Sequence, residues 1–402
     1  MRQPGPRRLL PLLSGLLLWP AHLPASGAQE TEQPMFGVEA QLVLVDVSVT
    51  KDGAAVPGLR KEDFTVFEDG VEQPLLHLEE VWTPGVGRPA GTGAYVALPR
   101  ILVFVIDELH MLPNQAEEAK RALLGFLDSG ARDGDRVAVV STATGQIAGT
   151  QMPDNRASLN AFIHGLKGRY ERHLIIEDLS EAEAFRIVKG DQSTKEAVGE
   201  RLVRDGTVFA PRGSDLAKRA QREAYRLAVQ VHGEAETRAR SVLGILARAL
   251  EWSAQWRGRK AFVLASNGFI YDPALPDFNA IARTAQRANG TVYFLDARRL
   301  GQQRGLGADR GPLSPVSGFS EAQVDLLTEA LAAEVMANES GGFIVRNTND
   351  LQGGLERIAD DVSAYYLIGY EPPEGPRTQK ELRRIEVRVA VPGVDVRHRK
   401  GY

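Results

Sequence analysis

The sequence predicts an α/β fold: a doubly wound, mostly parallel sheet with helices on both faces, a helical insertion and a small antiparallel β subdomain. Short apolar strands alternate with amphipathic helices across residues 99–363, which is typical of parallel sheets. Alternating strands separated by Asp-Gly, Pro or Gly turns occupy both ends of the chain. Residues 165–257 hold several charged helical stretches, more chain than one crossover needs.

The composition is that of a globular chain with room for two domains. Of its 402 residues, 43% are hydrophobic and 25% are charged. The formal net charge is -4 and the Lys and Arg residues are dispersed among acids, so we expect no nucleic-acid partner. The chain has no cysteine, which excludes disulfides, thiolate metal sites and Cys-based chemistry.

The N-terminus has the pattern of a secretory signal peptide. A basic start, MRQPGPRR, precedes the apolar stretch LLPLLSGLLLWP and the small residues PASGAQ, with cleavage expected after Ala28. No later segment is long and apolar enough to cross a membrane, so we expect no transmembrane segment in the mature chain. Export without cysteine is typical of a bacterial periplasmic or extracellular protein.

Strands at the two ends are expected to pair and form the β subdomain. Residues 41–50 alternate apolar and polar positions before an Asp-Gly turn, and a short strand within 63–70 ends in another such turn. EQPLLHLEEVW is a third candidate strand. Residues 29–98 and 364–402 would supply the two parts of this subdomain.

The central region, 99–363, predicts a sheet with strand order 3-2-1-4-5-6. Its expected strands are apolar and its expected helices carry an apolar stripe on one face. The expected strands cover 101–107, 133–141, 260–268, 290–297 and 341–347, and the helices 115–128, 277–289, 321–338 and 350–363.

The helical insertion shows its own start signals. Capping-box patterns begin at Ser180 and Ser193, each with a Glu three residues later. Residues 214–252 predict one long helix, or two that meet at Gly233. Gly- and Pro-rich stretches at 84–94 and 301–318 are expected surface loops, and the second would overhang the carboxyl edge of the sheet.

The stretch FVIDELHMLP places a carboxylate directly after a buried strand. Side chains at the carboxyl ends of parallel strands face an open crevice, where α/β proteins bind ligands. The candidate crevice residues are Asp107, Glu108, His110, Ser266, Asn267 and Asp296. Asp296 is equally able to pair with Arg298 or Arg299 at the rim, an interaction worth little energetically.

The order ILVFVIDELHM, DGDRVAVVS, KAFVLASNGF, TVYFLDAR and GGFIVRNTNDL resembles the von Willebrand factor type A (VWFA) domain, which has a Rossmann-like sheet. The flanks VDVSVTKDG, VPGLRKEDFTVFEDG and SAYYLIGYEPP, with LRRIEVRVAVPGVDVRHRKGY, are similar to the VWFA-related Acidobacterial family. Together these motifs span nearly the whole mature chain. The resemblance implies an α/β module that binds protein partners, often through a divalent ion at the sheet's carboxyl edge.

The ion site implied by the resemblance is degenerate here. Asp107 matches the first residue of D-x-S-x-S, but Leu109 and Met111 hold the two serine positions, and Ser266-Asn267 replaces a later Asp. Thr237 and Ser241 lie in a helical pattern and do not supply the expected Thr. Mg²⁺ needs about six oxygen ligands, so Asp107 and Asn267 predict at best a weak site. The alternative is that Asp107 accepts hydrogen bonds from backbone or from Asn267.

No catalytic motif is present. The chain lacks G-x-S-x-G, H-E-x-x-H and G-x-x-x-x-G-K-[ST], and no acidic turn has the length or closing Glu of an EF-hand. We therefore expect a non-enzymatic module that binds a protein partner through the crevice edge. Two alternatives stay open: a metal-dependent enzyme using Asp107, Glu108 and His110, and a structural envelope component with a dead metal site.

Overall fold

The computed structural model describes residues 42–88, 93–170, 179–209, 215–298, 321–372 and 383–402. The expected signal peptide, 1–28, and the expected loop 301–318 lie outside these residues. Gln41–Tyr402 form one compact unit. No helix in the described part of the chain is both long and apolar enough to span a membrane.

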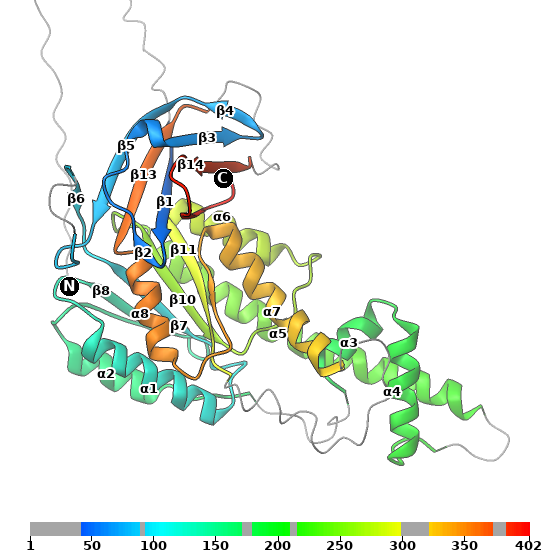
Figure 1. Cartoon of the computed structure of the whole chain (residues 1–402). Helices are drawn as coiled ribbons and strands as arrows, with labels where there is room; N and C mark the ends of the chain where they lie inside the picture. The colour runs from blue at the N-terminus through cyan, green and yellow to red at the C-terminus, as the bar shows by residue number, and fades with distance from the viewer. Residues whose placement is uncertain (1–41, 89–92, 171–178, 210–214, 299–320, 373–382) are drawn as a thin grey trace, which may run out of the picture. The chain divides into compact units, whose positions relative to one another are not determined.

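The mixed α/β class is confirmed, with parallel strands and helices in alternation through the middle of the chain (Figure 1). The strands are β1 (Val43–Lys51), β2 (Ala54–Ala55), β3 (Phe64–Glu68), β4 (Val71–Gln73), β5 (Leu75–Trp82), β6 (Val96–Ala97), β7 (Ile101–Ile106), β8 (Arg136–Ser141), β9 (Ile147–Gln151), β10 (Lys260–Ser266), β11 (Gly290–Asp296), β12 (Ile344–Val345), β13 (Ala364–Tyr370), β14 (Ile385–Val389) and β15 (Asp395–His398). The helices are α1 (Pro113–Ser129), α2 (Arg156–Gly165), α3 (Glu181–Val188), α4 (Gln192–Arg204), α5 (Leu216–Ser253), α6 (Pro276–Ala288), α7 (Glu321–Ser340) and α8 (Leu351–Asp361), with a short 3₁₀ turn at Lys61–Asp63.

The central sheet runs in the order β12-β11-β10-β7-β8-β9. All its pairs are parallel except β8 with β9, which form an antiparallel hairpin that the sequence analysis did not assign. Its strands β7, β10 and β11 are buried along their whole length, as expected for strands covered on both faces. Numbered along the chain, this order is 3-2-1-4-5-6.

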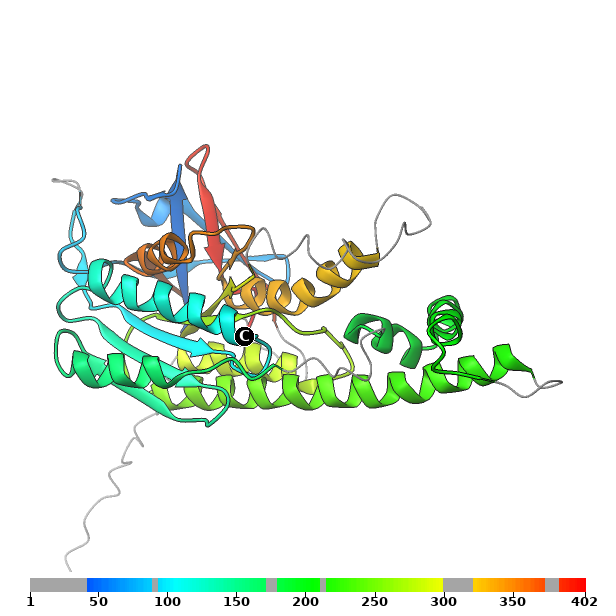
Figure 2. The same cartoon turned by 90° about the horizontal axis from the view of Figure 1, so that it is seen from below.

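Helices cover both faces of this sheet (Figure 2). One apolar core contains residues of α1, α2 and α8, including Phe126, Ile163 and Leu355. The other contains residues of α6, α7 and the carboxyl half of α5, including Leu246 and Ile281. Because helices cover both faces of the sheet, polar side chains gather where the strands end. At the carboxyl edge, strand ends and loops bring such side chains together.

Strands from the two ends of the chain pair directly. β1 pairs antiparallel with β13 and β15, and β14 pairs antiparallel with β3. Val45, Val47 and Val66 share a core with Tyr370, Ile385 and Val387. The boundaries expected at residues 98 and 363 stay predictions.

The helical region corrects one detail of the sequence analysis and decides between two alternatives that it left open. Ser180 caps α3 with the expected capping box, but α4 is capped by Asp191, whose side chain accepts from the Ser193 and Thr194 N–H groups. Ser193 is therefore the second residue of its helix and not the cap. α5 is one helix of 38 residues that passes through Gly233 without a break. Tertiary packing at both of its halves outweighs the glycine's weak helix preference.

Candidate functional site

The carboxyl ends of four adjacent strands bring the predicted crevice residues to one edge. The Asp107 N–H donates to Ala265 at the end of β10, 2.9 Å away, and the Thr142 N–H donates to Ile106 at 3.2 Å. Ser266 pairs with Asp296 across β10 and β11. Asp107, Ser266 and Asp296 therefore share this edge of the sheet.

Asp107 is completely buried, and protein donors occupy both of its carboxylate oxygens. The Ser266 hydroxyl donates to Oδ2 at 2.5 Å, and the His110 ring Nδ1 lies 2.8 Å from the same oxygen. The His110 backbone N–H donates to Oδ1 at 3.2 Å. The exposed fraction of Asp107 is 0%, so bulk solvent does not reach these bonds. A buried carboxylate needs such partners, because burying it without them is costly.

His110 is held between Asp107 and an aromatic ring. Burial lowers the pKa of His110, but the negative charge of Asp107 and its hydrogen bond outweigh burial, so the pKa lies above the ordinary value. Its ring packs on Phe269, with ring centroids 5.4 Å apart. Nε2 is buried and has no hydrogen-bond partner among the described residues. The Nδ1 contact fixes the ring orientation and leaves Nε2 as an unsatisfied polar atom.

Of the two donors expected for Asp107, the backbone is observed, but Asn267 does not bond Asp107. Its amide nitrogen donates to the His110 carbonyl at 2.9 Å and to Gln115 Oε1 at 2.5 Å. Its Oδ1 is buried without a hydrogen-bond partner in the described part of the chain. Asn267 therefore ties the loop after β10 to the loop after β7.

Glu108 and Asp296 use other partners. Glu108 accepts hydrogen bonds from the Ser141 hydroxyl and, at 2.9 Å, from the Lys167 N–H. Asp296 forms a two-pronged ion pair with Arg298, with the shortest N to O distance 2.8 Å. Asp296 therefore pairs with Arg298 at the rim, which is one of the pairings predicted for it. The Glu108 carboxylate accepts hydrogen bonds from the end of β8 and from the segment after α2.

That segment, Lys167–Tyr170, lies against the loop that follows β7, and we call it the strap. The Arg169 N–H donates to the Glu108 carbonyl at 2.7 Å, and the Tyr170 N–H donates to the Met111 carbonyl at 3.0 Å. A Cβ on Gly168 would lie 2.4 Å from the Leu112 carbonyl oxygen, so only glycine permits this approach. The start of the helical insertion therefore closes the loop that follows β7.

The residues of this edge do not fit the divalent ion that the resemblance implies. Mg²⁺ needs about six oxygen ligands in a near-octahedral array. Both oxygens of Asp107 already accept protein donors, and buried Met111 lies where the motif has a hydroxyl. Among the described residues, no group of three or more His, Asp or Glu side chains is placed to hold a metal. The weak site at Asp107 and Asn267 stays a prediction.

Three features of the site escaped the sequence analysis. Ser141 and Thr142 end β8 and bond Glu108, and Gln115 bonds Asn267. Ser141 and Thr142 had a usable signal, because they follow an apolar strand parallel to β7. The strap had none, since its contacts join residues that are distant in sequence. Thr237 and Ser241 lie on α5 and donate back to carbonyls four residues earlier, so they take no part here.

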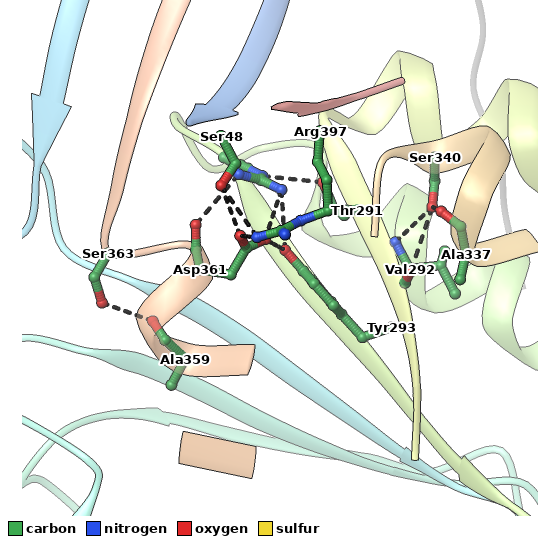
Figure 3. A network of polar contacts seen from close by, with 11 residues as sticks. Ser48, Thr291, Val292, Tyr293, Ala337, Ser340, Ala359, Asp361, Ser363 and Arg397 are labelled. Carbon is green, nitrogen blue, oxygen red and sulfur yellow. Dashed lines mark hydrogen bonds and ion pairs between the residues drawn. The ribbon is translucent and has the colours of Figure 1, made fainter. Parts of the chain in front are cut away.

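A second buried carboxylate, Asp361, lies near the amino ends of β10 and β11 (Figure 3). Arg259 Nη2 lies 3.0 Å from Asp361, and Arg397 makes a second ion pair with it. The hydroxyls of Ser48 and Tyr293 donate to it at 2.7 and 2.5 Å. Burial raises the pKa of Asp361, but Arg259 and Arg397 outweigh burial and hold it below the ordinary value. This cluster joins β1 and β15 to α8 and the central sheet.

Comparisons with known proteins add little. No known family's sequence model matches the chain, and no curated protein matches it. Among solved structures, the chain is similar to an aerotolerance-related membrane protein from Bacteroides fragilis NCTC 9343, solved with multiple mutations to serines. The TM-score is 0.32 at 11% identity, covering 66% of this chain and 98% of that one. A likeness this distant carries no argument about function.

Proposed function

We propose that this chain is an exported, non-enzymatic VWFA-like scaffold that binds protein partners without an ion at the crevice. The observation that carries the proposal is the closed state of Asp107. Its oxygens accept from Ser266 and His110, and it is fully buried. A site built to bind an ion presents free oxygens to it, whereas this carboxylate holds two loops together.

Two further observations support the proposal. The sheet order and the covering helices match what the sequence resemblance implies for a VWFA-like module. The strap holds the loop after β7 in place through backbone hydrogen bonds to Glu108 and Met111. Binding surfaces should therefore lie away from the crevice edge, where the sequence analysis had placed them, and partner binding should persist in the presence of a chelator.

The enzyme alternative would need Asp107, Glu108 and His110 to act on one substrate or ion. Glu108 instead bonds Ser141 and the strap, while Asp107 bonds His110 and Ser266. A general acid or base must reach a reacting group. The exposed fraction is 0% for Asp107, 2% for Glu108 and 4% for His110. Their burial favours the scaffold over the enzyme.

The proposal is tested by cross-linking the purified full chain to proteins of an envelope extract, once with Mg²⁺ and once with EDTA. We expect the same set of cross-linked proteins in both conditions, and the same set with Asp107→Asn if that variant folds. Cross-links that appear only with Mg²⁺ and vanish in the variant would contradict an ion-independent scaffold. Failure to cross-link any protein in either condition would contradict the binding role itself.

A further inference from the structure

The helical insertion has a core of its own, separate from the two cores of the central sheet. Leu179, Ile187 and Leu202 pack with Ala224 and Leu227 from the amino half of α5. This packing uses one face of α5 and leaves its other face exposed. Between the exposed face and the chain that follows α4 is a groove of about 400 Å³, which we call the basic groove.

One wall of the basic groove is apolar. Phe209 lines this wall and has 74% of its surface exposed. Its neighbour Val208 also lines the wall and is buried, with an exposed fraction of 8%. Tyr225 and Val229, which are 49% and 46% exposed on α5, lie outside the lining of the groove. An aromatic ring left this open gains little in the free chain. The same ring provides a large apolar contact to anything that covers it.

The other wall carries positive charge. Arg219, Arg222 and Arg226 line the groove at positions three and four residues apart, which places them on one face of α5. Glu223 forms an ion pair with Arg226, and their closest N to O distance is 2.6 Å. Three arginines and one glutamate give the lining a formal charge of 3 − 1 = +2. Arg219 and Arg222 form no hydrogen bond or ion pair with a described residue.

We propose that the basic groove binds an acidic segment of a protein partner. Carboxylates of that segment would pair with Arg219 and Arg222, whose planar guanidinium groups match a carboxylate with two parallel hydrogen bonds. An apolar side chain of the segment would cover Phe209. The inference rests on the proposed scaffold role and assigns that role a surface.

The geometry favours a peptide over the other polyanions. A volume of about 400 Å³ fits one or two side chains, which is the scale of a pocket for an anchoring residue. A membrane surface would need a flat or convex apolar face, whereas this site is concave. Nucleic acid requires a longer basic stripe, and the whole chain has a formal net charge of -4.

The test is fluorescence anisotropy with the full chain and two labelled probe peptides, one of repeated Glu-Glu-Phe and one of repeated Lys-Lys-Phe. We expect saturable binding of the acidic probe only, weakening as salt rises. The double variant Arg219→Glu/Arg222→Glu should lose about tenfold or more in affinity, equivalent to about 1.4 kcal/mol. Phe209→Ser should weaken binding by a smaller factor. Arg283→Glu, at an exposed arginine on α6, is the matched control and should bind like the parent chain.

Equal affinity for the two probes, or full affinity in the double variant, would overturn the assignment. So would binding of phosphatidylglycerol vesicles without binding of the acidic probe, since that result would make the groove a membrane site. The milder pair Arg219→Gln/Arg222→Gln replaces the charge reversal if the latter does not fold. Cross-links that persist in EDTA after the groove is mutated would reject the groove and keep the scaffold role.

Discussion

Asp107 and Asp361 are both buried carboxylates, but they lie near opposite edges of the central sheet and are balanced differently. Asp361 is paired with two arginines and two hydroxyls, and its pKa is lowered. Asp107 has one histidine and one hydroxyl, and two buried polar atoms beside it, His110 Nε2 and Asn267 Oδ1, have no partner among the described residues. The Asp361 carboxylate is balanced by two cations, and one atom of its cluster, Arg397 Nε, is buried without a hydrogen-bond partner in the described part of the chain. Asp107 has no arginine ion pair among the described residues, and its cluster leaves two buried polar atoms without partners.

The largest effect on stability is expected at the Asp361 cluster. Asp361→Ala removes the anion between Arg259 and Arg397 and leaves buried Arg259 without its counter-ion. Breaking a buried ion pair from one side costs about 3–5 kcal/mol, so the free energy of unfolding in urea should fall by that amount. Asp360→Ala, at the exposed neighbour on the same helix, should change it by less than about 0.5 kcal/mol. If Asp361→Ala and Asp360→Ala lowered the free energy of unfolding by similar amounts, the ion pairs of Asp361 would not be what stabilises this edge of the sheet.

The strap provides the next test, at the other edge. Gly168→Ala places a methyl group against the Leu112 carbonyl and should lower the free energy of unfolding by about 3 kcal/mol, the upper end for overpacking. Gly165→Ala is the matched control. It lies at the end of α2 with nothing within 4 Å of the new Cβ, so it should stabilise the chain by about 0.5 kcal/mol. A neutral Gly168→Ala would mean that the strap is not held against the crevice.

A buried histidine beside the Asp361 cluster gives that edge a pH dependence. Burial lowers the pKa of His398 to about 4, and its Nε2 accepts the Val387 N–H at 3.2 Å, which requires a neutral ring. The unfolded chain takes up this proton near pH 6.5, so stability is full above that value and is lost as pH falls toward 4. Between pH 8 and pH 5 the contribution of His398 to the free energy of unfolding should fall by about 2 kcal/mol, whereas His110, whose pKa is raised, acts in the opposite direction.

Urea unfolding at both pH values, in the parent chain and in His398→Gln, isolates this contribution. Between pH 8 and pH 5 the change in the variant should differ from that in the parent chain by about 2 kcal/mol, because glutamine does not titrate. An unchanged pH dependence in the variant would assign the drop to other groups and remove this distinction between the two edges.

The smallest expected effect on stability comes from removing one hydroxyl donor from each of the two carboxylates. Ser266→Ala removes a hydrogen bond to Asp107, and Ser48→Ala removes one from Asp361. Asp361 keeps two arginines, so Ser48→Ala should cost about 0.5–1 kcal/mol, whereas Ser266→Ala should cost about 1.5–2 kcal/mol. Thermal unfolding of the two variants side by side gives the order, and a reversed order would show that Asp107 is the better satisfied of the two.

Much of the fold follows from local patterns in the sequence. The apolar runs at β7, β10 and β11 and the striped helices α1 and α6 predict a parallel sheet, because their periodicity is set by which faces are buried. The hairpin strand β9 was missed, because half-exposed IAGTQ has no clear alternation. The cap of α4 was misplaced by two residues, since Asp191 and Ser193 are both good caps.

The sequence predicted where the candidate site lies, but it did not predict which groups the Asp107 carboxylate contacts. An apolar strand that ends at Asp107 places a carboxylate at the sheet's carboxyl edge. Whether that carboxylate faces an ion or a protein donor depends on Ser266, His110 and the strap. Those contacts are set by loop conformation and tertiary packing, which hydrophobic periodicity does not encode.

The most direct measurement is a titration of the full chain with Mg²⁺, Mn²⁺ and Ca²⁺, following heat and melting temperature, beside Asp107→Ala. A ligand that binds only the folded state must raise its stability. The closed crevice predicts no saturable heat and no rise in melting temperature with any of the three ions, and a lower melting temperature in the variant whether or not an ion is present. A saturable rise that disappears in Asp107→Ala would show that the crevice still binds an ion, and would contradict the account.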